Sequence, residues 1–239
     1  MLKTALIDAD IICYRIGFAC PEGEPVEFAL HSVKQTIHSA LGKLGVQDYR
    51  SYLSGSSNFR YHLATLKPYK GTRSERKPEH YEAIREYLVD VHGATITDGI
   101  EADDALGIEQ YSHPDKSTCI VSIDKDLDTI PGYHYNWVKD IYYDVSLEDA
   151  NYNFYTQMLV GDVSDNIPGI RGIGPKTAHK LLNPHKEDMR KVDDIVREKY
   201  REFYGDSEYE KAFDEVASLL WILRTPSTTW KEHVPYRKK

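Results

Sequence analysis

The sequence predicts an α/β fold, in which a mostly parallel sheet with flanking helices is followed by a helical region. Short apolar runs alternate with helical periods over the first 145 residues. Two of these runs, at 3–7 and 118–123, each lead into an aspartate. After residue 145 the periods are helical, with no strong strand between them. Strands that alternate with helices are typical of a parallel sheet covered on both faces.

The elements of the first part follow from apolar spacing and helix-terminating residues. The run at 3–7 predicts a strand, and the apolar spacing up to Gly17 predicts a helix after it. Apolar residues recur at a helical period over 31–44, which predicts a second helix. A proline near its start and Gly93 beyond its end delimit a helix at 78–91. The other expected elements are a helix at 102–111 and strands at 49–53, 94–97 and 118–123.

The second part contains helical patterns separated by short connections. These patterns lie at 146–162, 175–183, 189–205 and 209–224. We therefore expect a core at 1–145, a helical region packed on it at 146–224, and a polar, loosely held tail at 225–239.

The composition is typical of a water-soluble protein. Mean hydropathy is −0.55 and 28% of the residues are charged. No apolar run is long enough to span a membrane, and the N-terminus lacks the apolar region of a signal peptide, so we expect a cytoplasmic protein. Cys13, Cys20 and Cys119 cannot all pair and lack metal-ligand spacing, which predicts reduced core thiols.

The net charge of −8 argues at first against a nucleic-acid partner, because phosphate binding normally requires a basic surface. The acidic residues, however, concentrate in a few segments where divalent cations would reverse the local charge. The basic residues collect in two groups. The first group is Lys67, Lys70, Arg73, Arg76 and Lys77, and the second is Arg171, Lys176, Lys180, Lys186, Arg190 and Lys191.

Nine carboxylates recur on four short segments framed by apolar residues. They are Asp8, Asp10, Glu101, Asp103, Asp104, Asp124, Asp126, Asp162 and Asp165. Acidic side chains are rarely buried unless they are paired or bound to metal, so this pattern predicts one shared cation site. Asp8 and Asp124 each follow an apolar strand, and ligands of open α/β sheets bind beyond the carboxyl ends of strands. Oxygen ligands suit magnesium or manganese and not zinc.

Each acidic segment also has a structural interpretation. An aspartate such as Asp8, directly after a first strand, is often a helix N-cap. Glu101 and Asp104 have the spacing of a capping box. Asp128 is expected to be a solvated surface acid. The Asp-x-Asp pattern also begins haloacid-dehalogenase-type phosphatases, but the downstream Thr or Ser and the Lys that they require are not found in convincing contexts.

A glycine-rich hairpin is expected within 161–182, GDVSDNIPGIRGIGPKTAHKLL. Its glycines allow backbone N–H groups to approach a phosphate closely, and Pro175 begins a helix whose positive N-terminus faces the same anion. Lys176 and Lys180 extend this surface. A helical hairpin turn without a ligand is the alternative.

The segments IDAD, PYKGTR, GIEADDA, SIDKDLDTI and GDVSDNIPGIRGIGPKTA occur in this order along the chain. Their order and approximate spacing resemble the 5′-nuclease family of flap endonucleases, DNA polymerase I 5′-nuclease domains and small bacteriophage 5′-3′ exonucleases. The resemblance covers residues 3–182, and the chain looks most like a compact phage-type member. It implies a PIN-like core and a helix-three-turn-helix motif that holds duplex DNA.

The resemblance also implies two divalent metal ions, Mg²⁺ or Mn²⁺, in one active site. The ligands would be Asp8, Glu101, Asp103 and Asp104 for the first ion and Asp124, Asp126, Asp162 and Asp165 for the second, with Asp10 as a further candidate. Two ions about 4 Å apart activate a water and stabilise the leaving oxygen in an in-line attack on a phosphodiester. A potassium ion is expected at the hairpin.

Tyr69, Lys70 and Arg73 match family residues that contact the scissile phosphate and stack on the terminal base. A cation neutralises transition-state charge, and an aromatic ring offers a base a stacking face. A solvated basic loop is the alternative. The DNA-binding residues implied by the resemblance are Arg60, Lys67, Gly169, Gly172, Gly174, Lys176, Thr177 and Lys180.

Two features depart from the family pattern. Relatives carry an aspartate after the strand equivalent to 49–53, whereas this chain has Ser54 and Gly55, and Gly55 aligns better. One ligand of the first metal is therefore missing. From Arg73 to Glu101 the chain has room for little more than one helix, which argues against threading of a 5′ strand through a closed arch.

We therefore expect a metal-dependent 5′-3′ exonuclease with flap endonuclease activity, acting as a monomer in a bacterial or phage-infected cell. Its substrates would be DNA with 5′ ends, flaps or nicks, or RNA–DNA hybrids; no replication partner is identified. The alternative is a structure-specific DNA-binding protein with weakened or lost activity. The dense set of acids argues against it, because they would repel phosphates. A small-molecule magnesium phosphatase would not account for the hairpin.

Overall fold

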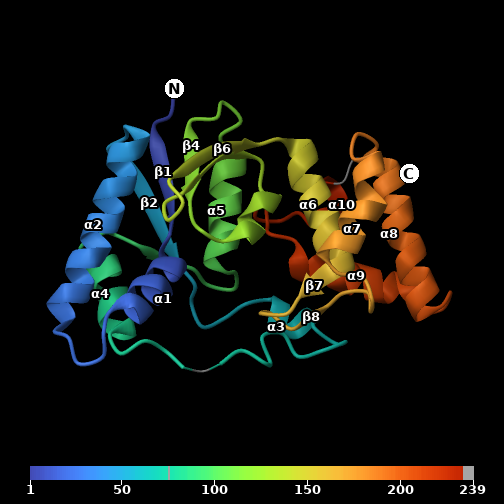
Figure 1. Ribbon diagram of the computed structural model, residues 1–239, viewed down its shortest axis with the longest axis horizontal. Coiled ribbons are helices and arrows are strands. Elements are labelled where there is room, and N and C mark those ends of the chain that lie inside the picture. The colour runs from blue at the N-terminus through green and yellow to red at the C-terminus, as the bar shows by residue number, and fades with distance from the viewer. Residues whose placement is uncertain (75, 234–239) are drawn as a thin grey trace. The chain divides into compact units, whose positions relative to one another are not determined.

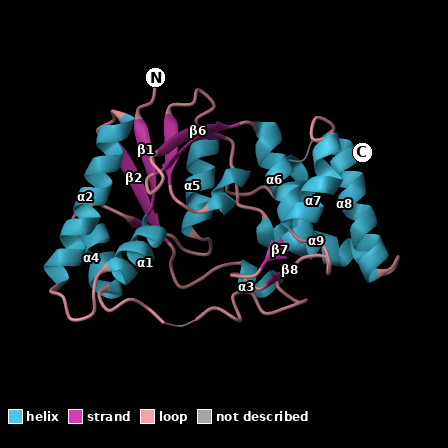
Figure 2. Ribbon diagram, viewed as in Figure 1, coloured by secondary structure: helices cyan, strands magenta, loops and turns pink. Residues whose placement is uncertain are grey.

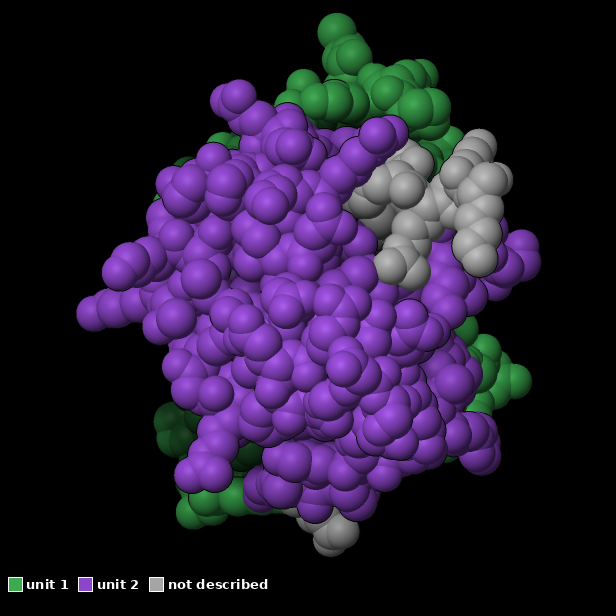
Figure 3. Space-filling view, turned by 90° about the vertical axis from the view of Figure 1, so that its right-hand side faces the viewer, with its two compact units in different colours: residues 1–58, 75–145 green, residues 59–74, 146–239 purple. Residues whose placement is uncertain are grey.

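The computed structural model describes residues 1–74 and 76–233, which form two compact units (Figures 1 and 3). The sheet unit comprises Met1–Asn58 and Glu75–Val145, and the helical unit comprises Phe59–Ser74 and Ser146–Lys239. Among the described residues, no helix combines the length and apolar character needed to cross a membrane. The end of the expected tail, 234–239, lies outside the described residues.

The sheet unit is built on a sheet with the strand order β3-β2-β1-β4-β5-β6 (Figure 2). Its strands are β1 (Thr4–Asp8), β2 (Asp48–Leu53), β3 (Thr95–Ile96), β4 (Thr118–Val121), β5 (Gly132–Asn136) and β6 (Ile141–Val145). Neighbouring strands are parallel except β5 and β6, which are antiparallel. Because β1 lies between β2 and β4, the carboxyl ends of these three strands meet at one edge of the sheet.

Helices cover both faces of this sheet, as the alternation of strands and helices predicted. They are α1 (Ala9–Ala19), α2 (Val26–Leu44), α4 (Tyr81–Asp90) and α5 (Ala102–Tyr111), with a 3-10 helix at Lys125–Thr129. One apolar cluster joins α1, α2 and α4 to the alternate β1 side chains Ala5 and Ile7. Helix α5 lies on the other side of the sheet (Figure 1). Cys13 and Cys119 are free thiols buried in the core, as predicted, whereas Cys20 is a free thiol that is only partly buried.

The antiparallel hairpin of β5 and β6 was not predicted. Its strands are rich in tyrosine, and β6 leaves Ile141 and Tyr142 about half exposed, so no continuous apolar run marks it. Pairing along its whole length, from Gly132 with Val145 to Asn136 with Ile141, determines its structure. Helix α2 also begins five residues before the predicted start at 31, at Val26.

The helical unit has an aromatic core. Its helices are α3 (Arg60–Leu63), α6 (Leu147–Val160), α7 (Pro175–Leu182), α8 (Met189–Tyr204), α9 (Tyr209–Leu220) and α10 (Trp230–His233), with a 3-10 helix at Asn183–His185. The short strands β7 (Gly161–Asp162) and β8 (Ile167–Pro168) pair antiparallel between α6 and α7. Phe154 contacts the rings of Trp221 and Trp230, and Tyr200 contacts that of Phe213.

Two segments belong to this core that the sequence did not assign to it. The segment 59–74, far from 146–239 in the chain, is held by Glu215 of α9, whose carboxylate accepts hydrogen bonds from the backbone N–H groups of Thr65 and Leu66 at 2.7 Å. Trp230 lies within the expected loose tail, yet its side chain is only 1% exposed. The described part of that tail is therefore anchored in the core.

Candidate active site

The carboxyl edge of the sheet unit brings together acids from β1 and from the segment after β4. Asp8 ends β1 and is the N-cap of α1, where its side chain accepts from the N–H of Ile11 at 3.1 Å. Its other oxygen accepts from the hydroxyl of Ser122 at 2.7 Å. The same Ser122 hydroxyl accepts from the backbone N–H of Asp124 at 3.0 Å. Ser122, which the sequence analysis missed, therefore links the ends of the two strands.

The third acidic segment lies at the start of α5. Glu101 is the N-cap, and its backbone N–H donates to the side chain of Asp104 at 3.0 Å in a capping box. The Asp104 side chain is completely buried. The structural interpretation thus holds for this pair, whether or not either residue also binds metal. Asp103, between them, is half-buried.

Burial and mutual repulsion shift the protonation of these acids. Burial raises the pKa of Asp8 to about 7, and the negative charge of Asp10 adds to the shift, while the hydrogen bonds from Ser122 and Ile11 act in the opposite direction. Burial also raises the pKa of Asp103 well above its usual range, with further contributions from the charges of Asp8 and Asp124. The two pKa values are therefore raised first by burial and then by the like charges of neighbouring acids.

Asp10 lies beside the residue that follows β2. The backbone N–H of Ser54 donates to its carboxylate at 3.0 Å, and a guanidinium nitrogen of Arg85 on α4 lies 3.4 Å from its other oxygen. Gly55, the residue aligned with the missing aspartate, is instead packed against backbone. A Cβ there would lie 2.1 Å from the carbonyl oxygen of Thr97. Ser54, rather than Gly55, therefore occupies the edge where a carboxylate is missing.

Asp124 and Asp126 form one turn after β4. Asp124 is the N-cap of the 3-10 helix at Lys125–Thr129 and accepts from the N–H of Asp126 at 2.9 Å. Asp128, expected to be solvated, accepts instead from the hydroxyl of Tyr143 on β6 at 2.7 Å and is half-buried. This contact fastens the turn to the unpredicted hairpin.

The donor chemistry at this edge fits a divalent metal ion that prefers oxygen ligands. The candidate side chains are carboxylates, and a bound cation would favour their charged forms against the burial and the like charges that raise the pKa values of Asp8 and Asp103. In the part of the chain that the structure describes, no three acidic, histidine or cysteine side chains converge on a common point closely enough to hold an ion.

Asp162 and Asp165, assigned by resemblance to the second metal, belong to the helical unit. Asp162 accepts from the N–H of Ser164 at 2.7 Å and from that of Asp165 at 3.3 Å, which closes the turn after β7. Asp165 faces the PYKGTR segment of the same unit. Lys70, at φ 56°, donates its backbone N–H to the Asp165 carbonyl at 2.8 Å.

The three predicted catalytic residues all contact the Asp165 carboxylate. The Tyr69 hydroxyl donates to it at 2.8 Å, the Lys70 ammonium lies 3.8 Å away, and a guanidinium nitrogen of Arg73 lies 3.3 Å away. The segment is therefore not a solvated basic loop. The stacking role expected for Tyr69 is not supported, because the residue is only 5% exposed and the edge of its ring packs against Tyr61.

The glycine hairpin has a packed base and an open tip. At Gly169 a Cβ would lie 2.2 Å from the backbone of Val160, so this glycine serves close packing and its expected contact with DNA is not supported. Gly172, at φ 89°, and Gly174, the N-cap of α7, have open space where a Cβ would project. Lys67 of the first basic group is exposed, and so are Lys176, Thr177 and Lys180 near the tip.

Arg60 requires a correction. Its side chain is 3% exposed, and it donates to the carbonyl oxygens of Leu219 at 2.9 Å and Trp221 at 2.7 Å. These carbonyls belong to the end of α9, where the helix leaves acceptors without intrahelical donors. Arg60 therefore satisfies the C-terminus of α9 and is not available to bind DNA.

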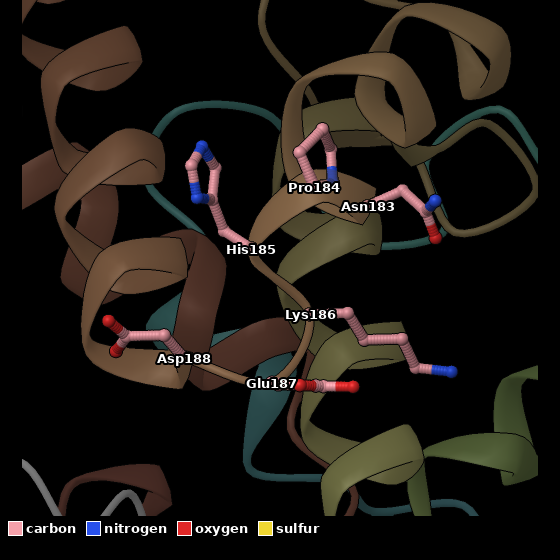
Figure 4. Close-up of a pocket in the computed structure, with 6 residues that line it drawn as sticks. All are labelled: Asn183, Pro184, His185, Lys186, Glu187 and Asp188. Atoms are coloured by element: carbon pink, nitrogen blue, oxygen red, sulfur yellow. The ribbon is translucent and has the colours of Figure 1, made fainter.

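A hollow of about 470 Å³ in the helical unit is lined by residues of a single segment, Asn183–Asp188. Figure 4 shows their side chains pointing in different directions instead of converging. Lys186 is paired with Asp149 on α6. The hollow contains none of the predicted catalytic or metal-binding residues and does not enlarge the candidate site.

Comparison with known proteins agrees with this arrangement. Residues 152–213 match the family model described as 5′-3′ exonuclease, C-terminal SAM fold. The chain is 28% identical over 228 residues to DNA polymerase I of Caldicellulosiruptor bescii, a match that covers 83% of this chain and 27% of that protein. It thus spans about a quarter of the length of this relative.

Two solved structures share the fold. The zinc-bound 5′-exonuclease of bacteriophage T5 has a TM-score of 0.61 at 17% identity, over 92% of this chain and 100% of that chain. The catalytic core of Rad2 in complex with DNA substrate has a TM-score of 0.53 at 16% identity, over 90% of this chain and 79% of that chain. In family model, sequence and fold, as well as in the order of its acidic and glycine motifs, the chain is similar to 5′-3′ exonucleases and to the 5′-exonuclease of bacteriophage T5.

Proposed function

We propose that this protein is a divalent-metal-dependent 5′-3′ exonuclease with flap endonuclease activity, which hydrolyses phosphodiester bonds near the 5′ ends of DNA. The observation that carries the proposal is the gathering of carboxylates at the carboxyl edge, where the Ser122 hydroxyl links Asp8 at the end of β1 to the turn of Asp124 after β4. Such a cluster is unfavourable for binding DNA phosphates, but it is suited to divalent cations. The metal-bound T5 and DNA-bound Rad2 structures support the same chemistry.

The side chains of the sheet unit would bind Mg²⁺ or Mn²⁺. Asp8, Asp103 and Asp124 are the proposed ligands at its core, and Glu101 and Asp126 stand at the adjoining turns. When bound, two such ions lower the pKa of an attacking water and stabilise the leaving oxygen. Ser122 keeps Asp8 and the turn of Asp124 in register through its hydroxyl.

The helical unit would bind the substrate backbone. The open hairpin tip at Gly172 and Gly174 leaves room for a phosphate, and exposed Lys176 and Lys180 supply positive charge. Lys70 and Arg73, held on Asp165 in this structure, carry the cationic groups proposed to neutralise charge at the scissile phosphate. Asp162 and Asp165 are retained as proposed metal ligands.

The test uses 5′-labelled flap, nicked and blunt duplexes with Mg²⁺, Mn²⁺ or EDTA. We expect cleavage from the 5′ end with either metal and none in EDTA, and product lengths distinguish exonuclease from flap cleavage. Asp124→Asn combined with Asp165→Asn should abolish cleavage while duplex binding persists. Full cleavage in EDTA or by the double variant would disprove the site. Specific duplex binding without cleavage by the wild-type protein under all conditions would instead identify a structure-specific DNA-binding protein.

A further inference from the structure

We propose that Asn166 is a positioning residue for Lys70 and Arg73, because its side-chain amide fixes the backbone of the segment that carries them. The proposal rests on the proposed function, in which these two cations act at the scissile phosphate, and it adds an uncharged residue through which they are held. Its basis is a pair of hydrogen bonds within the helical unit, two backbone conformations and one tightly packed glycine.

Two hydrogen bonds join the PYKGTR segment to the turn between β7 and β8 (Figure 1). The side-chain amide of Asn166 donates to the carbonyl oxygen of Pro68 at 2.9 Å. In the opposite direction, the backbone N–H of Lys70 donates to the carbonyl oxygen of Asp165 at 2.8 Å. The backbone of the segment is thus held at two points that lie two residues apart.

Lys70 has a backbone conformation that depends on this support. Its φ is 56°, in the left-handed region that lysine rarely adopts. It stands third in a turn that the N–H of Gly71 closes by donating to the Pro68 carbonyl at 3.0 Å. Such a conformation persists only where surrounding contacts determine it. Release of the Pro68 carbonyl would therefore let Lys70 leave this region and turn its side chain elsewhere.

Asn166 and Gly71 are both suited to the contact with Pro68. Asn166 has φ 57°, a conformation that asparagine adopts more readily than most residues do. At Gly71 a Cβ would lie 2.9 Å from the Cβ of Pro68 and 3.0 Å from its carbonyl oxygen. A carbonyl oxygen has two lone pairs, and without a side chain at Gly71 the Pro68 oxygen accepts from both neighbours.

The Asn166 contact is separate from the ion pairs on Asp165. The Asp165 carboxylate holds the side chains of Lys70 and Arg73, and under the proposed function both side chains leave it to reach a phosphate. Asn166 is uncharged and holds a backbone carbonyl, so this exchange of partners leaves its hydrogen bond intact. The backbone therefore keeps its position while the two side chains move.

Cleavage of a 5′-labelled flap duplex with Mg²⁺, measured as kcat and KM, tests the proposal. Asn166→Gly removes the amide but keeps a residue that adopts positive φ. We expect kcat to fall about 10- to 100-fold, because a misplacement of about 1 Å costs up to about 100-fold in rate. KM and duplex binding should not change. Lys116→Gly is the matched control, since Lys116 is exposed, has φ 55° and lies in the sheet unit outside the acidic segments.

A cycle of variants shows whether Asn166 acts through the two cations. In a background of Lys70→Ala with Arg73→Ala, Asn166→Gly should slow single-turnover cleavage no further, because the groups that it positions are absent. Gly71→Ala disturbs the Pro68 carbonyl from the other side and should also lower kcat without raising KM. An equal loss from Asn166→Gly in both backgrounds would overturn the proposal, and so would a melting temperature low enough to explain the loss by unfolding.

The cation variants also separate this proposal from the one on which it rests. If Lys70→Ala with Arg73→Ala slows cleavage and Asn166→Gly does not, the proposed function stands and the role of Asn166 is wrong. If the loss of both cations leaves kcat unchanged, their proposed role at the scissile phosphate is wrong, and the role of Asn166 falls with it.

Discussion

The acids of the two units are in opposite electrostatic states. At the edge of the sheet unit, burial raises the pKa values of Asp8 and Asp103, and the negative charges of neighbouring acids raise them further. In the helical unit, Asp165 instead faces the hydroxyl of Tyr69 and the cations of Lys70 and Arg73. Aspartates that look equivalent in sequence therefore differ in what they require. Burial and like charges favour the neutral forms of Asp8 and Asp103, whereas Lys70 and Arg73 favour the charged form of Asp165.

The largest difference should appear in metal affinity. Asp124→Asn, at the sheet edge, is expected to weaken Mn²⁺ binding to the DNA-free protein by about 100-fold, the upper end of effects seen at metal sites. Asp165→Asn should weaken it less, because Lys70 and Arg73 already compete with a metal ion for that carboxylate. Calorimetric titration of both variants measures the two effects. Equal losses of Mn²⁺ affinity in the two variants would show that the aspartates of the two units do not differ in this way.

The metal-free protein should lose stability as the pH rises because of Asp8. Its carboxyl has a pKa of about 7 in the folded state against 3.8 as the usual value, so from pH 4 to 7 the unfolded chain holds fewer protons. Stability then falls with rising pH, by roughly 1.4 kcal/mol for each unit of pKa shift. Asp8→Asn removes this pH-dependent contribution to the free energy of unfolding.

The measurement is urea unfolding of the wild-type protein and Asp8→Asn in EDTA at pH 5 and pH 7.5. The stability of the wild type relative to the variant should decrease between these values, and Mg²⁺ should reverse the decrease. Asp165→Asn provides the comparison from the other unit. A relative stability of wild type and Asp8→Asn that is independent of pH would show that Asp8 is ionised throughout.

Gly55→Ala should destabilise the sheet unit by about 1–3 kcal/mol, the usual cost of overpacking. The added Cβ would lie 2.1 Å from the Thr97 carbonyl oxygen, which belongs to backbone and cannot turn away. Gly42→Ala, in α2 with open space around it, is the control and should stabilise by about 0.5–1 kcal/mol. Urea unfolding measures both changes. If Gly55→Ala left stability unchanged, a side chain would fit at Gly55, and the missing carboxylate could then be placed there.

Tyr69→Phe should destabilise the helical unit by roughly 1.5 kcal/mol, because it removes a hydrogen bond to a charged group at a buried position. Tyr61→Phe, on a residue that is 53% exposed, should change stability little. Urea unfolding compares the two variants. If Tyr69→Phe left stability unchanged, the hydrogen bond from the Tyr69 hydroxyl to Asp165 would not stabilise the helical unit.

The sequence predicted the elements that have strong local patterns. The apolar runs before Asp8 and Asp124 predicted β1 and β4, and parallel pairing then required both aspartates to lie at one edge. The hairpin of β5 and β6 was missed because its tyrosines give neither a continuous apolar run nor a clear turn. Both the correct predictions and the missed hairpin thus depend on the sequence pattern within a single segment.

The roles of several site residues depend on partners far away in the chain and could not be read from motifs. Tyr69 donates to an aspartate 96 residues further on, and Arg60 to carbonyls at least 159 residues further on. A motif matches residue types and short spacings, and it carries no information on whether a basic side chain is buried. Ser122 could have been found, because a serine between a buried strand and an acidic turn is a local signal.

The close approach of Gly161 and Gly169 has a consequence for how this protein can change. A Cβ on either glycine would lie within 2.5 Å of the other strand's backbone, and the N–H of Ile170 donates to the Leu159 carbonyl at 2.8 Å beside them. The position of the hairpin is therefore set by backbone contact at its base and not by side chains at its tip. During evolution, substitutions of the exposed residues Lys176, Thr177 and Lys180 should change substrate affinity without loss of folding. Any side chain at Gly161 or Gly169 would instead disrupt the backbone contacts that hold the hairpin in place.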